Sequence, residues 1–439
     1  MTGGKRRIAQ GLLGALLLGC GSTPSTPEPP IEAPVEVPAE VPVAAPPEVA
    51  LEAPVEAAVE APAEPAPTVE SFAPFVAIDT HSDTTQRLLD EHADLASRLS
   101  DGHVDLIRMR EGGLSAVFMS IWVDPRRYPG EEAWTRAQAL IASVREFVAA
   151  HPDQVVLATT AEEVRTANRE GHAAMLMGIE GAHAFGEAEP EVLFQRLEES
   201  ARLGVRYVTL TWTNDNVFGH ASTGHHPGRG LTDVGRTLVT RMNDLGVMVD
   251  VSHVSDRTVL DAIEVTRSPV IASHSSARAL ADHPRNLSDV LLRRIAENHG
   301  AVCINYYAHF IDPAYGEARR ALEREHRAEF DALPRGRSWT TARARNALAH
   351  QLAPDLHPPT IRTLGAHFAH VAEVAGMDAV CMGSDFDGIS EPTGIVDVSE
   401  MGNIYAELTR RSLDVQRIAG ENVLRVMAAN EANVRVGAE

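Results

Sequence analysis

From residue 71 onward, short apolar segments alternate with longer stretches in which apolar and charged residues mix. The short segments are rich in Val, Ile, Met and Ala and carry almost no charge, which is typical of strands buried on both faces. We therefore predict eight strands, at Phe75–Asp83, Leu114–Val123, Ala173–Gly181, Tyr207–Trp212, Val247–His253, Pro269–Ser275, Ala301–Ala308 and Ala379–Gly388.

The stretches between these segments have the apolar period of amphipathic helices. Helices are predicted at Glu131–Ala150, Glu189–Leu203, Asp233–Leu245, Ser255–Val265, Ser288–Asn298 and Thr363–Val374, with a further helical excursion at 313–358 after the seventh strand. Eight strand-then-helix units favour an α/β fold, a (β/α)8 TIM barrel, which commonly spans ~200 to over 400 residues. The main alternative is a doubly wound open sheet, but no Gly-rich dinucleotide loop supports it.

The first 20 residues have the pattern of a targeting segment. Cationic residues 5–7 precede the apolar stretch Ile8–Leu18, which is too short to span a hydrocarbon layer of ~30 Å. The stretch ends in Leu17-Leu18-Gly19-Cys20, which resembles the bacterial lipoprotein processing box. That resemblance implies a lipoprotein signal peptide at 1–20 and lipidation of Cys20, which would anchor the chain to a membrane of the bacterial cell envelope. An ordinary secretory peptide with an incidental cysteine is the alternative.

Residues 21–70 contain ten Glu, neither Lys nor Arg, and 13 of the 27 Pro residues. Regularly spaced Glu side chains repel one another and Pro removes backbone donors, so no core can form in this segment. We expect a disordered Pro/Glu/Ala-rich linker at 21–70, followed by a barrel domain at 71–439.

Composition narrows the classes of function. The 439 residues carry a formal net charge of −22, and 51 acidic and 36 basic residues remain without the linker Glu residues and the first three cations. Nucleic acid is a disfavoured partner, because binding it requires a basic face. Three cysteines are too few for a disulfide scaffold, and we expect Cys303 and Cys381, which lie inside apolar segments, to be small buried hydrophobes.

Five of the eight predicted strands end in His, Asp or Glu at the same relative place. Apolar strands have no packing reason to end this way, whereas the C-terminal strand ends of a (β/α)8 barrel carry its catalytic residues. The endings are Asp79-Thr80-His81-Ser82-Asp83, Gly178-Ile179-Glu180-Gly181, Asp250-Val251-Ser252-His253, Ala272-Ser273-His274-Ser275 and Gly383-Ser384-Asp385-Phe386-Asp387-Gly388.

These residue types suit a pair of metal ions. His81 and Asp83 lie two positions apart, so on a strand they point to the same face, and both are suitable zinc ligands. Glu180 could bridge two ions, with His253 and His274 on the second. Five ligands are too many for one closed tetrahedral zinc, but they suit two ions ~3.5–4 Å apart that share a hydroxide and polarise a carbonyl. Each residue alone could be structural, and the set as a whole carries the prediction.

In order along the chain, these motifs resemble those of the membrane (renal) dipeptidase family of binuclear zinc peptidases. The resemblance extends over roughly residues 75–430 and includes two more motifs, Gly204-Val205-Arg206-Tyr207-Val208-Thr209-Leu210-Thr211 and His283-Pro284-Arg285-Asn286. It implies a barrel of amidohydrolase type that holds two Zn²⁺ ions per chain and cleaves dipeptides, often with a D-residue at the C-terminal side. Family members often dimerise, so a homodimer is a further expectation, although no interface can be identified.

The resemblance implies a role for several residues. His81 and Asp83 would bind one zinc ion, His253 and His274 the other, and Glu180, counted also as catalytic, would bridge them.

The remaining roles concern substrate and protons. Arg285 matches the family arginine that binds the substrate's terminal carboxylate, although an arginine after His-Pro could instead cap a helix. Asp385 matches the acid/base carboxylate. Trp212 stands where many members have a histidine that contacts the tetrahedral intermediate, so oxyanion stabilisation would depend more on zinc, Asn214 or Asn216.

Two other functions remain open. A related amidohydrolase acting on N-acyl amino acids or lactones would use the same metals. A catalytically idle, peptide-binding lipoprotein would explain Trp212 as a mark of lost activity, although an idle pocket has no need of five ligands. The adjacent His225 and His226 lie in a Gly-rich loop, where they could line the mouth of the site, and a solvated loop is the simpler explanation.

Overall fold

The computed structural model describes residues 74–333 and 339–435. The predicted signal peptide with Cys20, and the predicted linker at 21–70, lie outside these ranges. Within the described ranges, no helix is both long and apolar enough to span a lipid bilayer.

Eight parallel strands form a closed ring, because β2 pairs with β4 at one side of the sheet and β1 pairs with β9 at the other. The strands of the ring are β1 (Ile78–Ser82), β2 (Ala116–Trp122), β4 (Ala173–Glu180), β5 (Val205–Thr209), β6 (Met248–Asp250), β7 (Ile271–Ala272), β8 (Ala301–Ile304) and β9 (Val380–Met382). Seven of them lie within their predicted segments, and β5 begins two residues before its segment Tyr207–Trp212. The predicted (β/α)8 barrel is therefore confirmed and the doubly wound sheet is excluded. The short strand β3 (Val155–Leu157) was not predicted and pairs with β4 outside the ring.

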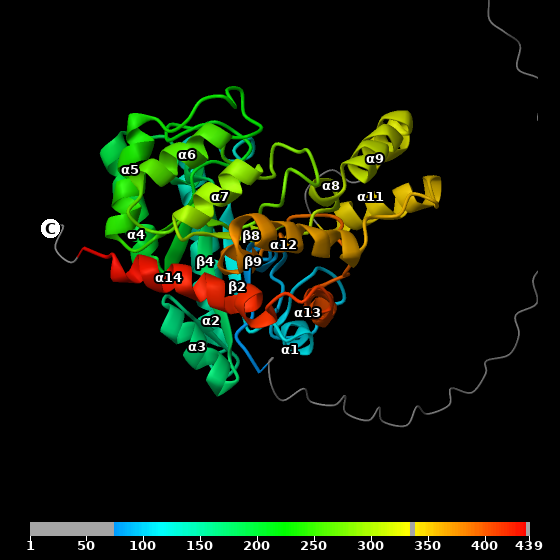
Figure 1. Ribbon diagram of the computed structural model, residues 1–439, viewed down its shortest axis with the longest axis horizontal. Helices are drawn as coiled ribbons and strands as arrows, with labels where there is room; N and C mark the ends of the chain where they lie inside the picture. The colour runs from blue at the N-terminus through cyan, green and yellow to red at the C-terminus, as the bar shows by residue number, and fades with distance from the viewer. Residues whose placement is uncertain (1–73, 334–338, 436–439) are drawn as a thin grey trace, which may run out of the picture. The chain divides into compact units, whose positions relative to one another are not determined.

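Helices follow most strands of the ring and cover its outer face (Figure 1). They are α1 (Leu106–Gly112), α2 (Glu131–Ala150), α3 (Ala161–Glu170), α4 (Pro190–Leu203), α5 (Asp233–Asp244), α6 (Asp256–Val265), α7 (Asp289–Glu297), α8 (Ala308–Ile311), α9 (Pro313–Glu325), α10 (Arg327–Asp331), α11 (Trp339–Leu352), α12 (Ile361–Ala375), α13 (Met401–Arg410) and α14 (Asn422–Ala432). Shorter 3-10 and π-helical turns are η1 (Arg87–Glu91), η2 (Ala182–Phe185), η3 (Met377–Ala379), η4 (Val398–Glu400) and η5 (Arg417–Glu421).

The six predicted helices are present with ends that differ by at most a few residues, and local capping explains several of the boundaries. Ser255 and Thr232 accept hydrogen bonds from the first turns of α6 and α5. The predicted excursion at 313–358 is also helical and contains α9 to α11. The labelled helices α9 and α11 lie on the side of the strands away from α4 and α5 (Figure 1).

Side chains alternate along each strand between two apolar layers. Along β2, Ala116 and Phe118 pack with Tyr207 inside the ring, whereas Val117 packs with Leu140 of α2 in the layer between strands and helices. This two-sided burial is why the strands have almost no charged residues until their C-terminal ends.

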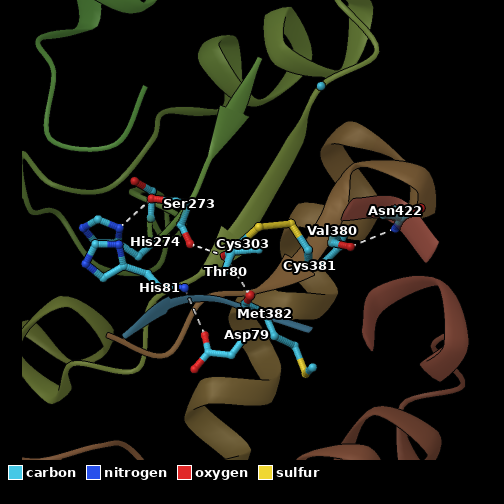
Figure 2. The surroundings of a disulfide bond; sticks show 12 residues. Asp79, Thr80, His81, Ser273, His274, Cys303, Val380, Cys381, Met382 and Asn422 are labelled. Carbon is cyan, nitrogen blue, oxygen red and sulfur yellow. Dashed lines mark hydrogen bonds between the residues drawn. A yellow bond between two sulfur atoms is a disulfide. The ribbon is translucent and has the colours of Figure 1, made fainter. Parts of the chain in front are cut away.

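A disulfide bond joins Cys303 of β8 to Cys381 of β9, at positions paired in the ladder (Figure 2). Both residues are fully buried, as predicted, but the expectation that they are merely small hydrophobes was wrong. Pairing them required the register of β8 against β9, which the sequence does not reveal. A cross-link between residues 78 positions apart stabilises a fold by ~4.5 kcal/mol in the chain-entropy model.

Candidate metal centre

The five predicted metal ligands lie together at the C-terminal ends of four strands. His81 is in β1 and Asp83 follows it, Glu180 ends β4, and His253 and His274 follow β6 and β7. All five are buried, with at most 9% of each residue exposed. The barrel therefore brings residues from distant parts of the chain into one small volume, because parallel strands end at the same face.

The two oxygens of Glu180 face different groups of imidazoles. Its Oε1 lies 2.8 Å from Nε2 of His253 and 3.6 Å from Nε2 of His274. Its Oε2 lies 3.5 Å from Nε2 of His81. Donor atoms of His81, Asp83 and Asp385 also lie within 4.8 Å of one another. This arrangement suits a carboxylate that bridges two cations.

The contacts among these side chains fit a divalent cation better than an empty hydrogen-bond network. The Nε2 atoms of His253 and His274 are only 2.8 Å apart. Two neutral imidazoles that turn their lone pairs toward each other repel unless a proton or a cation lies between them. In addition, His81 Nε2 and Asp83 Oδ1 are buried without a hydrogen-bond partner among the described residues. Imidazole nitrogens and carboxylate oxygens are the donors that zinc accepts.

Burial and mutual charge shift the titration of these groups. Burial, reinforced by the Glu180 carboxylate, raises the pKa of Asp83 to about 8. Burial also raises the pKa of Asp385 to about 6, and it lowers the pKa of His253 to about 3. Burial opposes a charged His81, but Glu180 and the two aspartates outweigh it and raise the pKa of that ring to about 10. A divalent cation would take the place of this proton on His81 and free its nitrogen for coordination.

Hydrogen bonds behind the ligands fix their orientation. The Tyr207 hydroxyl of β5 lies 2.8 Å from Nδ1 of His81. Ser273 Oγ lies 2.7 Å from Nδ1 of His274 and donates to Asp250 at 2.7 Å. Such contacts hold the other ring nitrogen, Nε2, toward the centre.

Sequence reasoning assigned no role to these supporting residues. Tyr207 and Asp250 lie inside the quoted motifs and could have been found there, but an aromatic residue in an apolar segment looks like core. Gly178 of β4 makes room for Tyr207, because a Cβ at Gly178 would lie 2.0 Å from the tyrosine ring. Asn305 donates to Asp385 at 2.9 Å. It lies inside the predicted segment Ala301–Ala308, which has no charged ending to mark it.

The backbone turns sharply at two of the site residues. His253 and Asp385 have φ angles of 66° and 67°, in the left-handed region that non-glycine residues rarely adopt. Such a conformation costs on the order of 1–3 kcal/mol and persists where the surrounding structure fixes it. Here the Ser222 amide donates to the His253 carbonyl, and the Asp385 amide donates to the His81 carbonyl.

Arg285 is a buried cation beside the centre. Its Nη2 donates to the His274 carbonyl at 3.2 Å, and its guanidinium carbon lies 5.4 Å from the centre of the Phe310 ring. Among the described residues it forms no ion pair, and its Nε has no hydrogen-bond partner. Burial lowers its pKa to about 10, although Asp385 and Glu180 favour the charged form. A buried guanidinium with an unused donor suits an anionic ligand.

The predicted oxyanion residues differ in what their side chains contact. The Trp212 ring lies 6.4 Å from that of His253, so it borders the centre. Asn214 lines a cavity of about 380 Å³ together with His183 and Tyr128. The Asn216 amide donates to a backbone carbonyl and accepts from two backbone amides of its own loop, so its polar atoms are already in use.

Comparison with known proteins finds similarity to dipeptidases in each case. A model of the membrane dipeptidase family (peptidase family M19) matches residues 70–437. An uncharacterised dipeptidase of Schizosaccharomyces pombe is 32% identical over 343 residues, which cover 74% of this chain and 72% of the relative. Dipeptidase tcpJ of Claviceps purpurea is 33% identical over 335 residues, which cover 73% of this chain and 67% of the relative.

A solved structure extends the comparison. The crystal structure of a metallopeptidase from Rhodobacter sphaeroides, liganded with a phosphinate mimic of the dipeptide L-Ala-D-Ala, superposes with a TM-score of 0.64. It is 26% identical, and the match covers 81% of this chain and 99% of that chain.

The Tyr207 contact predicts a loss of metal affinity when the hydroxyl is removed. We expect Tyr207→Phe to weaken the binding of a divalent cation at His81 by about 10–100-fold, because His81 loses the group that orients its ring. Competition with a chromophoric chelator measures this. Tyr306→Phe is the matched control, since the Tyr306 hydroxyl is buried without a hydrogen-bond partner among the described residues. Equal affinities in the two variants would contradict the assignment.

Proposed function

This chain belongs to the membrane dipeptidase family, a family of metal-dependent peptidases, and on that premise we propose that it hydrolyses dipeptides at a centre of two zinc ions. His81 and Asp83 would bind one ion, His253 and His274 the other, and Glu180 would bridge them. The observation that carries this proposal is the placement of the two Glu180 oxygens, which face His81 on one side and the other two histidines on the other.

The zinc pair would polarise the scissile carbonyl and lower the pKa of a water molecule enough to make it a nucleophile near neutral pH. Asp385 would move the protons. Its carboxylate is held by Asn305 at 2.9 Å, and burial raises its pKa to about 6, close to the range in which a carboxyl group can both accept and donate a proton. It would accept the proton of the attacking water and transfer it to the departing amine.

Arg285 would hold the C-terminal carboxylate of the substrate. Its guanidinium is buried, lacks an ion pair among the described residues and keeps Nε without a hydrogen-bond partner. A forked pair of charge-assisted hydrogen bonds would satisfy these donors. Because this anchor lies beside His274, it would place the terminal carboxylate close to the metals and favour dipeptides over longer peptides.

We extend the proposal to dipeptides with a D-residue at the C-terminal side. The Rhodobacter sphaeroides relative, solved with a mimic of L-Ala-D-Ala, supports this extension. Trp212 would border the scissile bond in place of the histidine that many family members have, which leaves oxyanion stabilisation to the zinc ions and to Asn214.

A hydrolysis assay tests this function. Purified, zinc-loaded protein should cleave L-Ala-D-Ala and L-Ala-L-Ala, as measured by the release of free alanine. Glu180→Gln should lose both bound zinc and activity, because it removes the bridging carboxylate. Asp385→Asn should keep its zinc and lose ~10²–10⁴-fold in kcat, because only proton transfer is removed. No hydrolysis above the Glu180→Gln background would contradict the proposal.

The carboxylate anchor gives a second test, which also separates a dipeptidase from a lactone hydrolase. Arg285→Ala should raise KM for dipeptides by about 10–100-fold, which corresponds to losing a hydrogen bond to a charged group of ~1.5–3 kcal/mol. Zinc content, measured in parallel, should not change. Hydrolysis of an N-acyl homoserine lactone, which has no carboxylate, would be insensitive to the same substitution. An unchanged KM for dipeptides would remove Arg285 from the substrate site.

We also propose that the chain is a lipoprotein of the bacterial cell envelope, anchored through Cys20. Two features support this location: the Leu-Leu-Gly-Cys sequence that ends at Cys20, and the Cys303–Cys381 disulfide, since disulfides persist mainly in oxidising compartments outside the cytosol.

Expression in a bacterium with lipoprotein processing tests the location. The full chain should incorporate labelled palmitate and fractionate with membranes, because acyl chains on Cys20 anchor it. Cys20→Ala should lose both properties while keeping dipeptidase activity. A Cys20→Ala protein that still incorporates palmitate would refute lipidation at this residue.

A further inference from the structure

The loop between β5 and α5, residues 210–232, contains a second group of ligand-type side chains. One donor atom from each of Asp215, His220 and His226 lies within 4.8 Å of the other two. Nδ1 of His226 is 3.1 Å from Oδ2 of Asp215. In a tetrahedral zinc site with bonds of ~2.0–2.1 Å, adjacent donor atoms lie ~3.4 Å apart. The distance between these two donor atoms is thus close to the distance that a bound zinc ion requires.

The two polar residues deepest in this group are oriented by the backbone. His220 donates from Nδ1 to the Gly230 carbonyl at 2.8 Å, which leaves Nε2 as the nitrogen with an available lone pair. Asp215 accepts from the amides of Ala221 and His226 at 2.9 and 3.1 Å. A carboxylate oxygen has two lone pairs and can accept more than one contact, so these bonds fix the carboxylate and still leave room for a cation.

We propose that Asp215, His220 and His226 form a third metal site, which takes a divalent cation of the zinc class and leaves one coordination position to water. Two imidazoles and one carboxylate are a typical three-ligand zinc set, and the five residues between His220 and His226 match the spacing of zinc-binding histidine pairs. Ca²⁺ and Mg²⁺ prefer sites made of oxygen ligands alone. The His226 side chain is 54% exposed, which gives an ion in solution access to the site.

The site is separate from the barrel centre but rests on the same backbone. The His220 carbonyl accepts from the Ser255 amide at 2.9 Å, and the Ser222 amide donates to the His253 carbonyl at 2.8 Å. A cation bound by the loop would therefore hold the segment that supports His253, and it would also fix Asn214, which lines the adjacent cavity. The ion would serve to order the loop and would contact no substrate.

Metal counting on the full chain tests the proposal. The protein is stripped with a chelator, reloaded with Zn²⁺, and its zinc content per chain is measured by mass spectrometry. His226→Ala should bind one equivalent less than the wild type. His225→Ala is the matched control, because it removes the neighbouring exposed histidine and should bind as much zinc as the wild type. If His226→Ala folds poorly by circular dichroism, Asp215→Asn replaces it.

The comparison is independent of the dipeptidase proposal. A His253→Ala, His274→Ala double variant, which damages the barrel centre, should keep the equivalent of zinc that depends on His226. Wild type and His226→Ala binding equal zinc would overturn the loop site, whatever the barrel holds. Loss of an equivalent in both single-histidine variants would also overturn the assignment, because His225 is not part of it.

Limited proteolysis gives a second measurement that needs no activity. Arg229 is exposed in the loop, so trypsin can cleave after it when the loop opens. Zinc at ~100 times its dissociation constant should slow this cleavage by up to about 100-fold in wild type and His225→Ala. It should have no effect in His226→Ala. If the contact between Asp215 and His226 is only an ion pair, zinc will leave cleavage unchanged in all three proteins.

Discussion

The buried carboxylate of Glu180 is the group on which the centre depends. An ionised carboxylate removed from water costs several kcal/mol unless cations or hydrogen-bond donors compensate it. Around Glu180 the barrel places three imidazoles, and two more carboxyl groups, the buried Asp83 and the partly buried Asp385, add negative charge. Without a metal ion, this excess of negative charge favours a proton on His81, and the pKa of that ring is therefore raised to about 10. Two divalent cations would balance the negative charge more completely, and they would also supply the chemistry that activates a water molecule.

Much of this could be predicted from the sequence because a barrel strand is buried on both faces. A polar residue at the end of an apolar segment is therefore conspicuous, and that signal located His81, Glu180 and Asp385. The same rule failed for β3, which has only three residues and is partly exposed. It also failed for Tyr207, whose hydroxyl is hidden among core aromatics.

Other features depend on which strands and loops lie next to one another in space, and the pattern of residues along the sequence does not show this. The bond between Cys303 and Cys381 follows from the pairing of β8 with β9. The left-handed turn at His253 is set by contacts with the loop after β5, and that loop places His220 and His226 beside Asp215. The sequence marked His226 only as a histidine of a Gly-rich loop, because its spacing from Asp215 and His220 in space is not visible in the linear order.

X-ray anomalous scattering from crystals of the zinc-loaded protein would show whether the Glu180 carboxylate bridges two ions in this barrel. We predict two strong peaks at the zinc edge, ~3.5–4 Å apart, one on each side of Glu180. One peak should have His81 and Asp83 as ligands, and the other His253 and His274. A single peak, or none, within bonding distance of Glu180 in the zinc-saturated protein would mean that this carboxylate does not bridge two ions.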